Sequence, residues 1–354
     1  MQNKRELLPN QVVSNGAIGQ EPLLVPPIAG FWRRFLAWLV DVIILGVAGH
    51  IIGIMFARFL FKIGPYGRPL GLLFILPYFG LMNSEIGEGQ TLGKRLMNIA
   101  VRDARNESIS VPRSLARIAI LALFPLFNGW AIPLMQNPLL AWFSSLIVLG
   151  LGGAIVYTMV FNRTARQGIH DLLVGTYVVH LLGEPVQAFP KTSRFHWKVA
   201  GIWLGVVAVG SVGMMLFAPS ARSSPRLATA VQIFDVLQDD SRFFTVTVND
   251  RTFSGAHGKT SRVLIIEVWY KGLPEKENRE AVAAEIIRTV FENATDVEKY
   301  DGIQVNITSA YDIGVAKAHV SWGFWDSIEG WRKRVAACDV LRKRALPGWL
   351  WIMP

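Results

Sequence analysis

The sequence predicts an α-helical multispan membrane domain of about five transmembrane helices, followed by a small soluble α+β domain. Of the 354 residues, 51% are apolar and only 18% are charged, against about 25% charged in a typical soluble domain. Residues 118–162 contain no charged side chain at all. The third observation is a formal net charge of +10, whose distribution along the chain indicates how the helices are oriented.

Five stretches are apolar enough to be spans, because a helix needs about 20 apolar residues to cross the hydrocarbon core. The uncharged region 118–162 holds two of them, separated by a turn at 136–138. The second stretch is the shortest and contains Pro77. Residues 1–30 are polar and Pro-rich, which predicts a flexible cytoplasmic leader and not a signal peptide. The predicted spans are residues 35–57, 69–84, 118–135, 139–161 and 199–218.

The basic residues fall mainly on one side of these spans. Fourteen Lys and Arg lie before the first span and in the loops after the second and fourth spans, and three lie in the loop after the first. The positive-inside rule therefore predicts a cytoplasmic N-terminus and an extracytoplasmic C-terminal domain. Residues 1–218 hold 18 Lys+Arg and 9 Asp+Glu, whereas residues 219–354 hold 18 and 17. The excess is thus a topology signal, so we expect a lipid bilayer as partner and no nucleic acid.

Two charged residues mark the start of the first span: Arg34 lies at its cytoplasmic boundary, and Asp41 lies inside it. They are seven residues apart and share a helix face, while His50 lies on the opposite face. An ionised Asp inside the bilayer costs about 2.5–3.5 kcal/mol, so Asp41 needs a partner or a proton. Two interpretations stay open: a structural clamp to a neighbouring helix or basic loop, or a titrating or ion-coordinating carboxylate.

A Gly-rich basic motif follows the second span. It departs from a phosphate-binding loop, because Glu88 and Arg95 replace the required Gly and Ser/Thr. The motif instead predicts a turn and a basic amphipathic helix at the inner leaflet, with Leu92, Leu96, Ile99 and Ala100 on its apolar side. Its candidate residues are Gln90, Thr91, Gly93, Lys94 and Arg95.

An adjacent His170 and Asp171 follow the fourth span. An imidazole beside a carboxylate can relay protons near neutral pH. The same pair can equally cap its segment and bind the basic loops. Both interpretations stay open.

Together, these motifs resemble the RDD family of bacterial integral membrane proteins, which is named for one Arg and two Asp. The resemblance covers about residues 29–179 and rests on Arg34 and Asp41, the Gly-Gln-Thr-Leu-Gly-Lys-Arg block, and the Gly-Ile-His-Asp segment. It implies a multi-pass module of the bacterial inner membrane, with Arg34, Asp41 and Asp171 as candidates for the naming residues. Cation/proton antiport is proposed for some members. This chain adds a fifth span and a large tail.

The residues after the fifth span are predicted to form a separate domain. Their patterns predict two strands, a helix and two further strands, in that order. The predicted division is a leader at 1–30, an RDD-like domain at 31–196, a fifth transmembrane helix at 197–218, a linker at 219–228, an α+β extracytoplasmic domain at 229–325, and a basic, Trp-flanked helix at 326–354. That last helix either lies on an anionic membrane or packs against the domain.

Two functional hypotheses follow. The first is a transport or ion-coupling module centred on Asp41, with Arg34, His170 and Asp171 nearby. The second is a non-transporting anchor or assembly factor whose periplasmic domain binds a partner protein. Gly201 and Gly205 form a small-xxx-small pair that hints at a homodimer. We expect no enzyme, no cofactor and no metal site, since no catalytic motif is present and the chain has a single cysteine.

Overall fold

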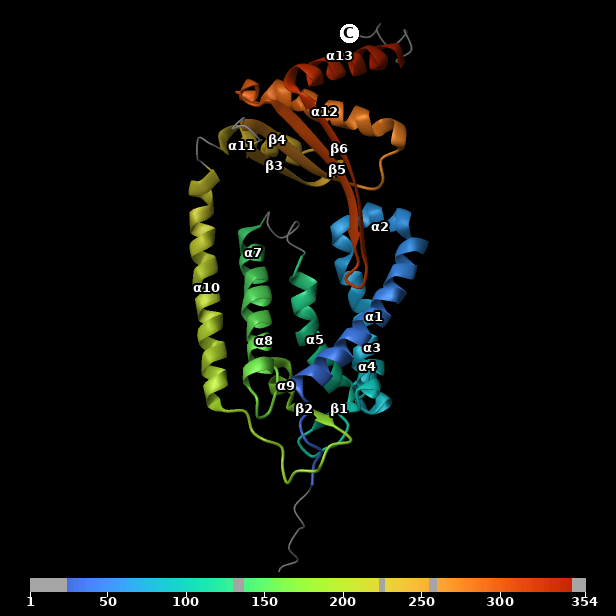
Figure 1. Ribbon diagram of the computed structural model, residues 1–354, viewed down its shortest axis with the longest axis vertical. Helices are drawn as coiled ribbons and strands as arrows, with labels where there is room; N and C mark the ends of the chain where they lie inside the picture. Colours follow the sequence, from blue (N-terminus) through green and yellow to red (C-terminus); the bar gives the residue numbers. More distant parts are fainter. Residues whose placement is uncertain (1–23, 130–136, 223–226, 255–259, 346–354) are drawn as a thin grey trace, which may run out of the picture.

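The structure is a computed structural model that describes residues 24–129, 137–222, 227–254 and 260–345. A bundle of long helices carries the C-terminal domain at one end, here called the domain end (Figure 1). Short helices and a two-stranded sheet form the opposite end, here called the polar end. The molecule therefore consists of a helical membrane domain and a small α+β domain, as predicted.

Four described segments are long and apolar enough to cross a membrane: Phe31–Met55, Ala57–Met82, Pro138–Phe161 and Arg194–Phe217. The first is helix α1, and the last lies within helix α10 (Arg194–Arg222). Helix α5 (Val111–Phe127) is shorter and packs on the second and third segments. It corresponds to the predicted third span, of which residues 130–135 lie outside the described residues. Side chains such as Ile43, Val47 and Ile51 on α1 are exposed, as expected of a surface that faces lipid.

The second membrane segment is interrupted. It comprises α2 (Ala57–Ile63), the 3₁₀ helix η1 (Gly64–Gly71) and α3 (Leu72–Met82). Gly64 has φ +62°, a left-handed conformation that favours glycine, and Pro69 lacks the N–H that a continuous helix requires. The span predicted at 69–84 therefore covers only its second half.

The third membrane segment is continuous and comprises α7 (Pro138–Ser145), the π-helical turn η3 (Leu146–Leu151) and α8 (Gly152–Phe161). It begins at the predicted turn, where the side chain of Asn137 accepts hydrogen bonds from the N–H groups of Leu139 and Leu140. The carbonyl of Leu149 in the π turn accepts a hydrogen bond of 2.9 Å from the Trp203 indole of α10. That bond ties the third segment to the last one.

The polar end is built from η2 (Glu85–Gly87), α4 (Leu92–Leu96), α9 (Ile169–Val174), and the antiparallel strands β1 (Ile99–Asp103) and β2 (Thr176–His180). The amphipathic helix predicted here is shorter than expected. Asn98 turns the chain with φ +52°, and Ile99 and Ala100 belong to β1 and are buried there. The predicted apolar side was therefore wrong for Ile99 and Ala100, whereas Leu92 and Leu96 lie on α4 and are exposed, as the lipid-facing side chains of α1 are.

The C-terminal domain is one sheet covered by helices on one face. Strands β3 (Phe243–Ser254), β4 (Thr260–Tyr270), β5 (Gly302–Asp312) and β6 (Lys317–Ser327) follow each other in that order across the sheet, with β4 and β5 parallel and the other neighbours antiparallel. The predicted order of strands and helix is confirmed, with α12 at Arg279–Asn293 between β4 and β5. Helix α11 (Ala228–Gln238) precedes them and was not predicted.

The basic C-terminal helix, α13 (Ile328–Ala345), packs against the sheet. Its Trp331 is completely buried, and the indole donates a 2.8 Å hydrogen bond to the Ile303 carbonyl. The helix lies at the side of the domain that is farthest from the bundle (Figure 1). Packing against the domain, one of the two sequence interpretations, therefore describes α13 better than a position on the membrane that the spans cross.

Candidate functional site

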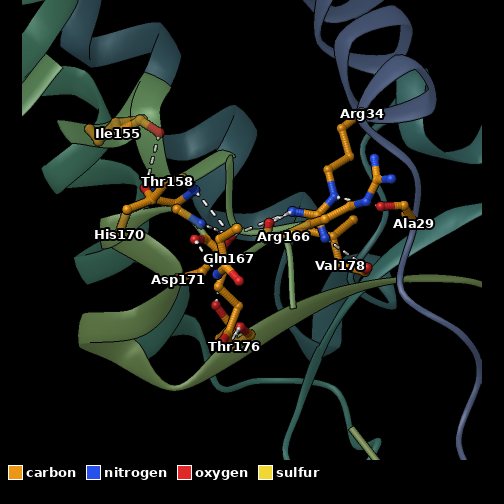
Figure 2. Close-up of polar contacts among 12 residues, drawn as sticks. Ala29, Arg34, Ile155, Thr158, Arg166, Gln167, His170, Asp171, Thr176 and Val178 are labelled. Atoms are coloured by element: carbon orange, nitrogen blue, oxygen red, sulfur yellow. Dashed lines mark hydrogen bonds and ion pairs between the residues drawn. The ribbon is translucent and has the colours of Figure 1, made fainter. Parts of the chain in front are cut away.

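Arg34 joins the start of α1 to the segment that carries α9 and β2. Its side chain is buried, and its guanidinium donates hydrogen bonds to the carbonyls of Ala29, Arg166 and Val178 (Figure 2). These partners lie far apart in the sequence. One side chain thus fixes the start of α1 against the chain that follows the third membrane segment, Pro138–Phe161.

Asp171 lies at the centre of a second set of contacts and is only 1% exposed. The Arg117 guanidinium of α5 donates a 2.8 Å bond to one carboxylate oxygen, and Thr176 donates a 3.0 Å bond to the same oxygen. Arg34 lies 3.9 Å from the other oxygen. Burial, the largest single effect, raises the pKa of Asp171, but the charges around the carboxylate, led by Arg117, and the hydrogen bond from Arg117 together hold the pKa well below its usual range. The carboxylate is therefore ionised at neutral pH, between two arginines.

His170 packs beside this carboxylate, with its Nε2 3.4 Å from Asp171. Burial lowers the pKa of His170 to about 3, against the usual value near 6.5. The Nδ1 atom has no hydrogen-bond partner among the described residues. The imidazole is therefore neutral at physiological pH. We call Arg34, Arg117, His170 and Asp171 the arginine cluster.

Asp41 lies on the same buried face of α1 as Arg34 but belongs to a different set of contacts. It is 1% exposed, and both of its oxygens accept hydrogen bonds. Tyr78 of α3 donates one of 2.7 Å, the Gly93 N–H one of 2.8 Å, and the Thr91 hydroxyl one of 2.6 Å. We call these four residues the Asp41 lock, since they join α1, α3 and the start of α4 through neutral donors.

Thr91 and Gly93 are in the lock because of local backbone geometry. The Thr91 side chain caps α4 by accepting the Lys94 N–H while donating to Asp41. A Cβ atom on Gly93 would clash with the carbonyl of Ala37, so only glycine allows α4 to approach α1 this closely. The Gly-Gln-Thr-Leu-Gly-Lys-Arg motif is thus the partner of the intramembrane Asp.

Lys94 lies between the two groups. It is half-buried, and its ammonium donates to the side-chain oxygen of Asn83. Burial lowers the pKa of Lys94 well below its usual value; the positive charge of Arg117 lowers it further, against the opposing effect of Asp41. Lys94 therefore lies near two arginines, Arg34 and Arg117, and near both buried carboxylates, Asp41 and Asp171.

The structure brings together Arg34, His170 and Asp171 from the predicted candidates, and places Asp41 with Thr91 and Gly93. The side chain of Gln90 donates a hydrogen bond to the Ile99 carbonyl of β1, and Arg95 is exposed.

The sequence did not identify Arg117 and Tyr78 as site residues. Arg117 had one available signal, since it is the last charge before the long uncharged stretch and Asp171 needed a counter-charge. Tyr78 had none, because an aromatic residue in an apolar span is ordinary.

Other candidate residues lie outside these groups. Gly201 and Gly205 are exposed on α10, and a Cβ atom on either would meet no other atom within 4 Å. No described helix of this chain therefore packs on the pair, and a homodimer stays a prediction. Among the described residues, no group of three or more His, Cys, Asp or Glu could hold a metal ion.

The apolar segments and the charged clusters at their polar end define a multi-pass membrane protein whose helices are fixed by buried arginine and aspartate side chains. Residues 28–175 match the RDD family. That part of the chain is therefore an RDD-family membrane region, as the motifs indicated, and the C-terminal domain lies outside the match. No curated protein and no solved structure matches the chain.

Proposed function

We propose that the protein is a non-transporting membrane anchor, in which the RDD-family region holds the C-terminal domain at one membrane face. The observation that carries this proposal is the saturation of Asp41. Both of its oxygens are occupied by donors of the same chain, and its side chain is almost completely buried. A carboxylate that binds and releases an ion must exchange these donors for water or the ion, and neutral donors alone satisfy Asp41 without either.

The arginine cluster supports the same proposal. Asp171 is ion-paired with Arg117 at 2.8 Å and lies beside Arg34. Removing one partner of a buried ion pair typically costs about 3–5 kcal/mol, because the other charge is left without compensation. The charges of Arg34, Arg117 and Asp171 thus stabilise the fold by compensating one another. His170 is neutral and contributes no charge at physiological pH.

Proton flux in proteoliposomes tests the proposal. The purified full-length protein is reconstituted with a pH-sensitive dye inside, and Na⁺ or K⁺ gradients are applied. We expect no flux above that of empty vesicles for the wild-type protein, and the same for Asp41→Asn. A cation-driven proton flux in the wild type that disappears in Asp41→Asn would contradict the anchor function and support ion coupling at Asp41.

A second candidate function, ion coupling, rests on Lys94. Its ammonium lies between Asp41 and Asp171, and burial already favours its neutral form. Loss of a proton from Lys94 would be the titrating step. In the same assay this candidate predicts a flux that Lys94→Met abolishes and Arg95→Met, which changes an exposed neighbour, leaves intact.

The proposed location is the bacterial inner membrane, with the polar end in the cytoplasm and the C-terminal domain in the periplasm. The 14 basic residues that precede the first predicted span or lie in the two polar-end loops support this orientation. The C-terminal domain would then bind a partner protein in the periplasm, which is the role that an anchored α+β domain without a catalytic motif fits best.

A further inference from the structure

The tip of the β5–β6 hairpin reaches into the membrane region. Strands β5 and β6 extend from the C-terminal domain down to the ends of α1 and α2 (Figure 1). Tyr311 and Ile313 at the tip are buried against Leu60 and Phe61 of α2. The Phe61 and Tyr311 rings meet edge to face, with 5.1 Å between their centroids. The domain therefore contacts the spans through an apolar insertion as well as through its covalent link to α10.

Glycines in α1 and η1 make room for the tip. A Cβ atom on Gly49 would lie 2.8 Å from Cγ2 of Val315. One on Gly53 would clash with the Tyr311 hydroxyl, and one on Gly71 with the Ile313 carbonyl. Gly46 on the same helix differs, since a Cβ atom there would meet nothing within 4 Å. The close approach is thus confined to the positions that face the hairpin.

A polar contact holds the tip in place. Asp312 forms a 3.1 Å ion pair with Arg68 of η1, and both side chains are largely buried. Within the tip, the Asp312 side chain also accepts the Gly314 N–H, and Ile313 donates to the Ala316 carbonyl. The interrupted part of the second span is thereby packed against protein, as non-helical backbone at membrane depth requires.

Helix α1 carries both the hairpin contact and the Asp41 lock. Gly49 is eight residues from Asp41, about 12 Å along the helix axis. We propose that the β5–β6 hairpin is a coupling element, through which a change in the C-terminal domain moves α1 and thereby loosens or tightens the Asp41 lock at the other end. The two arrangements are a docked tip and a withdrawn tip. This inference goes beyond the anchor function, because it assigns a route between the two domains.

Hydrogen exchange measured by mass spectrometry on the full-length protein in detergent micelles tests the coupling. Gly53→Ala inserts a methyl group against the Tyr311 hydroxyl. We expect it to speed exchange by about tenfold in the tip, residues 311–318, and also at Gly93, whose N–H donates to Asp41, and at Lys94, whose N–H donates to Thr91 of the lock. Adding Tyr311→Phe, which removes the clashing hydroxyl, should restore slow exchange in both regions. Gly46→Ala is the matched control and should change neither region.

Two outcomes overturn the proposal. Faster exchange in the tip with unchanged exchange at Gly93 and Lys94 would make the hairpin a static anchor. Unchanged exchange in the tip would show that the glycines do not control docking. If Gly53→Ala fails to give a monodisperse protein, Asp312→Asn replaces it, because this variant weakens the Arg68 contact without adding atoms. Hydrogen exchange is then measured in the same two regions, the tip and residues 93–94.

Discussion

At the scale of single residues, His170 links the polar end to pH. Its side chain is 3% exposed, and burial lowers its pKa to about 3. In the unfolded chain the imidazole takes up a proton near pH 6.5. Below that pH the unfolded state binds the extra proton, so the stability that neutral His170 contributes is lost as pH falls from about 6.5 towards 3, by at most about 1.4 kcal/mol per pH unit.

We therefore expect the melting temperature of the purified protein to fall between pH 7 and pH 5, and His170→Gln to flatten that fall. Asp171 does not contribute in this window, because its pKa is held below the ordinary value and its loss of stabilisation begins only below about pH 4. His319→Gln, an exposed substitution on β6, is the control and should keep the wild-type slope. An equal slope in His170→Gln would contradict the assignment of a buried, neutral imidazole.

At the scale of elements, the contact between α4 and α1 depends on one glycine. Gly93 leaves no room for a Cβ atom against the Ala37 carbonyl, and its N–H donates to Asp41. Gly93→Ala should therefore push α4 away and lower the melting temperature, although alanine is by itself the better helix former by about 1 kcal/mol. Gly201→Ala on α10 has open space around it and should be neutral or slightly stabilising. Equal melting temperatures for the two variants would refute the close-packing argument.

The elements also show what sequence alone could predict. The long uncharged stretches of the sequence correctly predicted the third membrane segment and α10, because a helix that crosses the hydrocarbon core must be continuously apolar. Alternation located the start of β3 and the helical period located α12 for the same kind of local reason. The interrupted second span was misplaced, since its 3₁₀ segment is shaped by a hairpin that lies about 240 residues later in the chain. Local pattern carries no information about such a contact.

The sequence likewise predicted only part of the candidate site. Asp41 and Asp171 could be selected because a charge near the bilayer needs a partner. Which partner each one takes depends on the packing of α3, α4 and α5, and apart from the position of Arg117 that packing has no signature in the sequence. Arg34 and Asp41 share a face of α1 as expected, yet they contact different groups, because Arg34 is drawn to the carbonyls of Ala29 and Val178.

At the scale of the whole molecule, the two ends of the helical bundle differ in charge, and only one of them carries the C-terminal domain. The polar end gathers most of the membrane-half Lys and Arg, while the domain end carries the near-neutral C-terminal domain (Figure 1). The positive-inside rule acts on such short basic loops. It therefore predicts that residues near β1 face the cytoplasm and that the sheet of the C-terminal domain faces the opposite compartment.

Cysteine labelling of bacterial spheroplasts tests this orientation. Cys338 is the only native cysteine, so a Cys338→Ala background gives an unlabelled chain. Asn249→Cys, exposed on β3, should react with a membrane-impermeant maleimide on intact spheroplasts, whereas Ala104→Cys, exposed in the turn after β1, should react only after permeabilisation. The reverse pattern would place the C-terminal domain in the cytoplasm. Reaction of both sites on intact spheroplasts would mean that the chain does not separate its two ends across one membrane, because the domain end and the polar end are joined by the same spans.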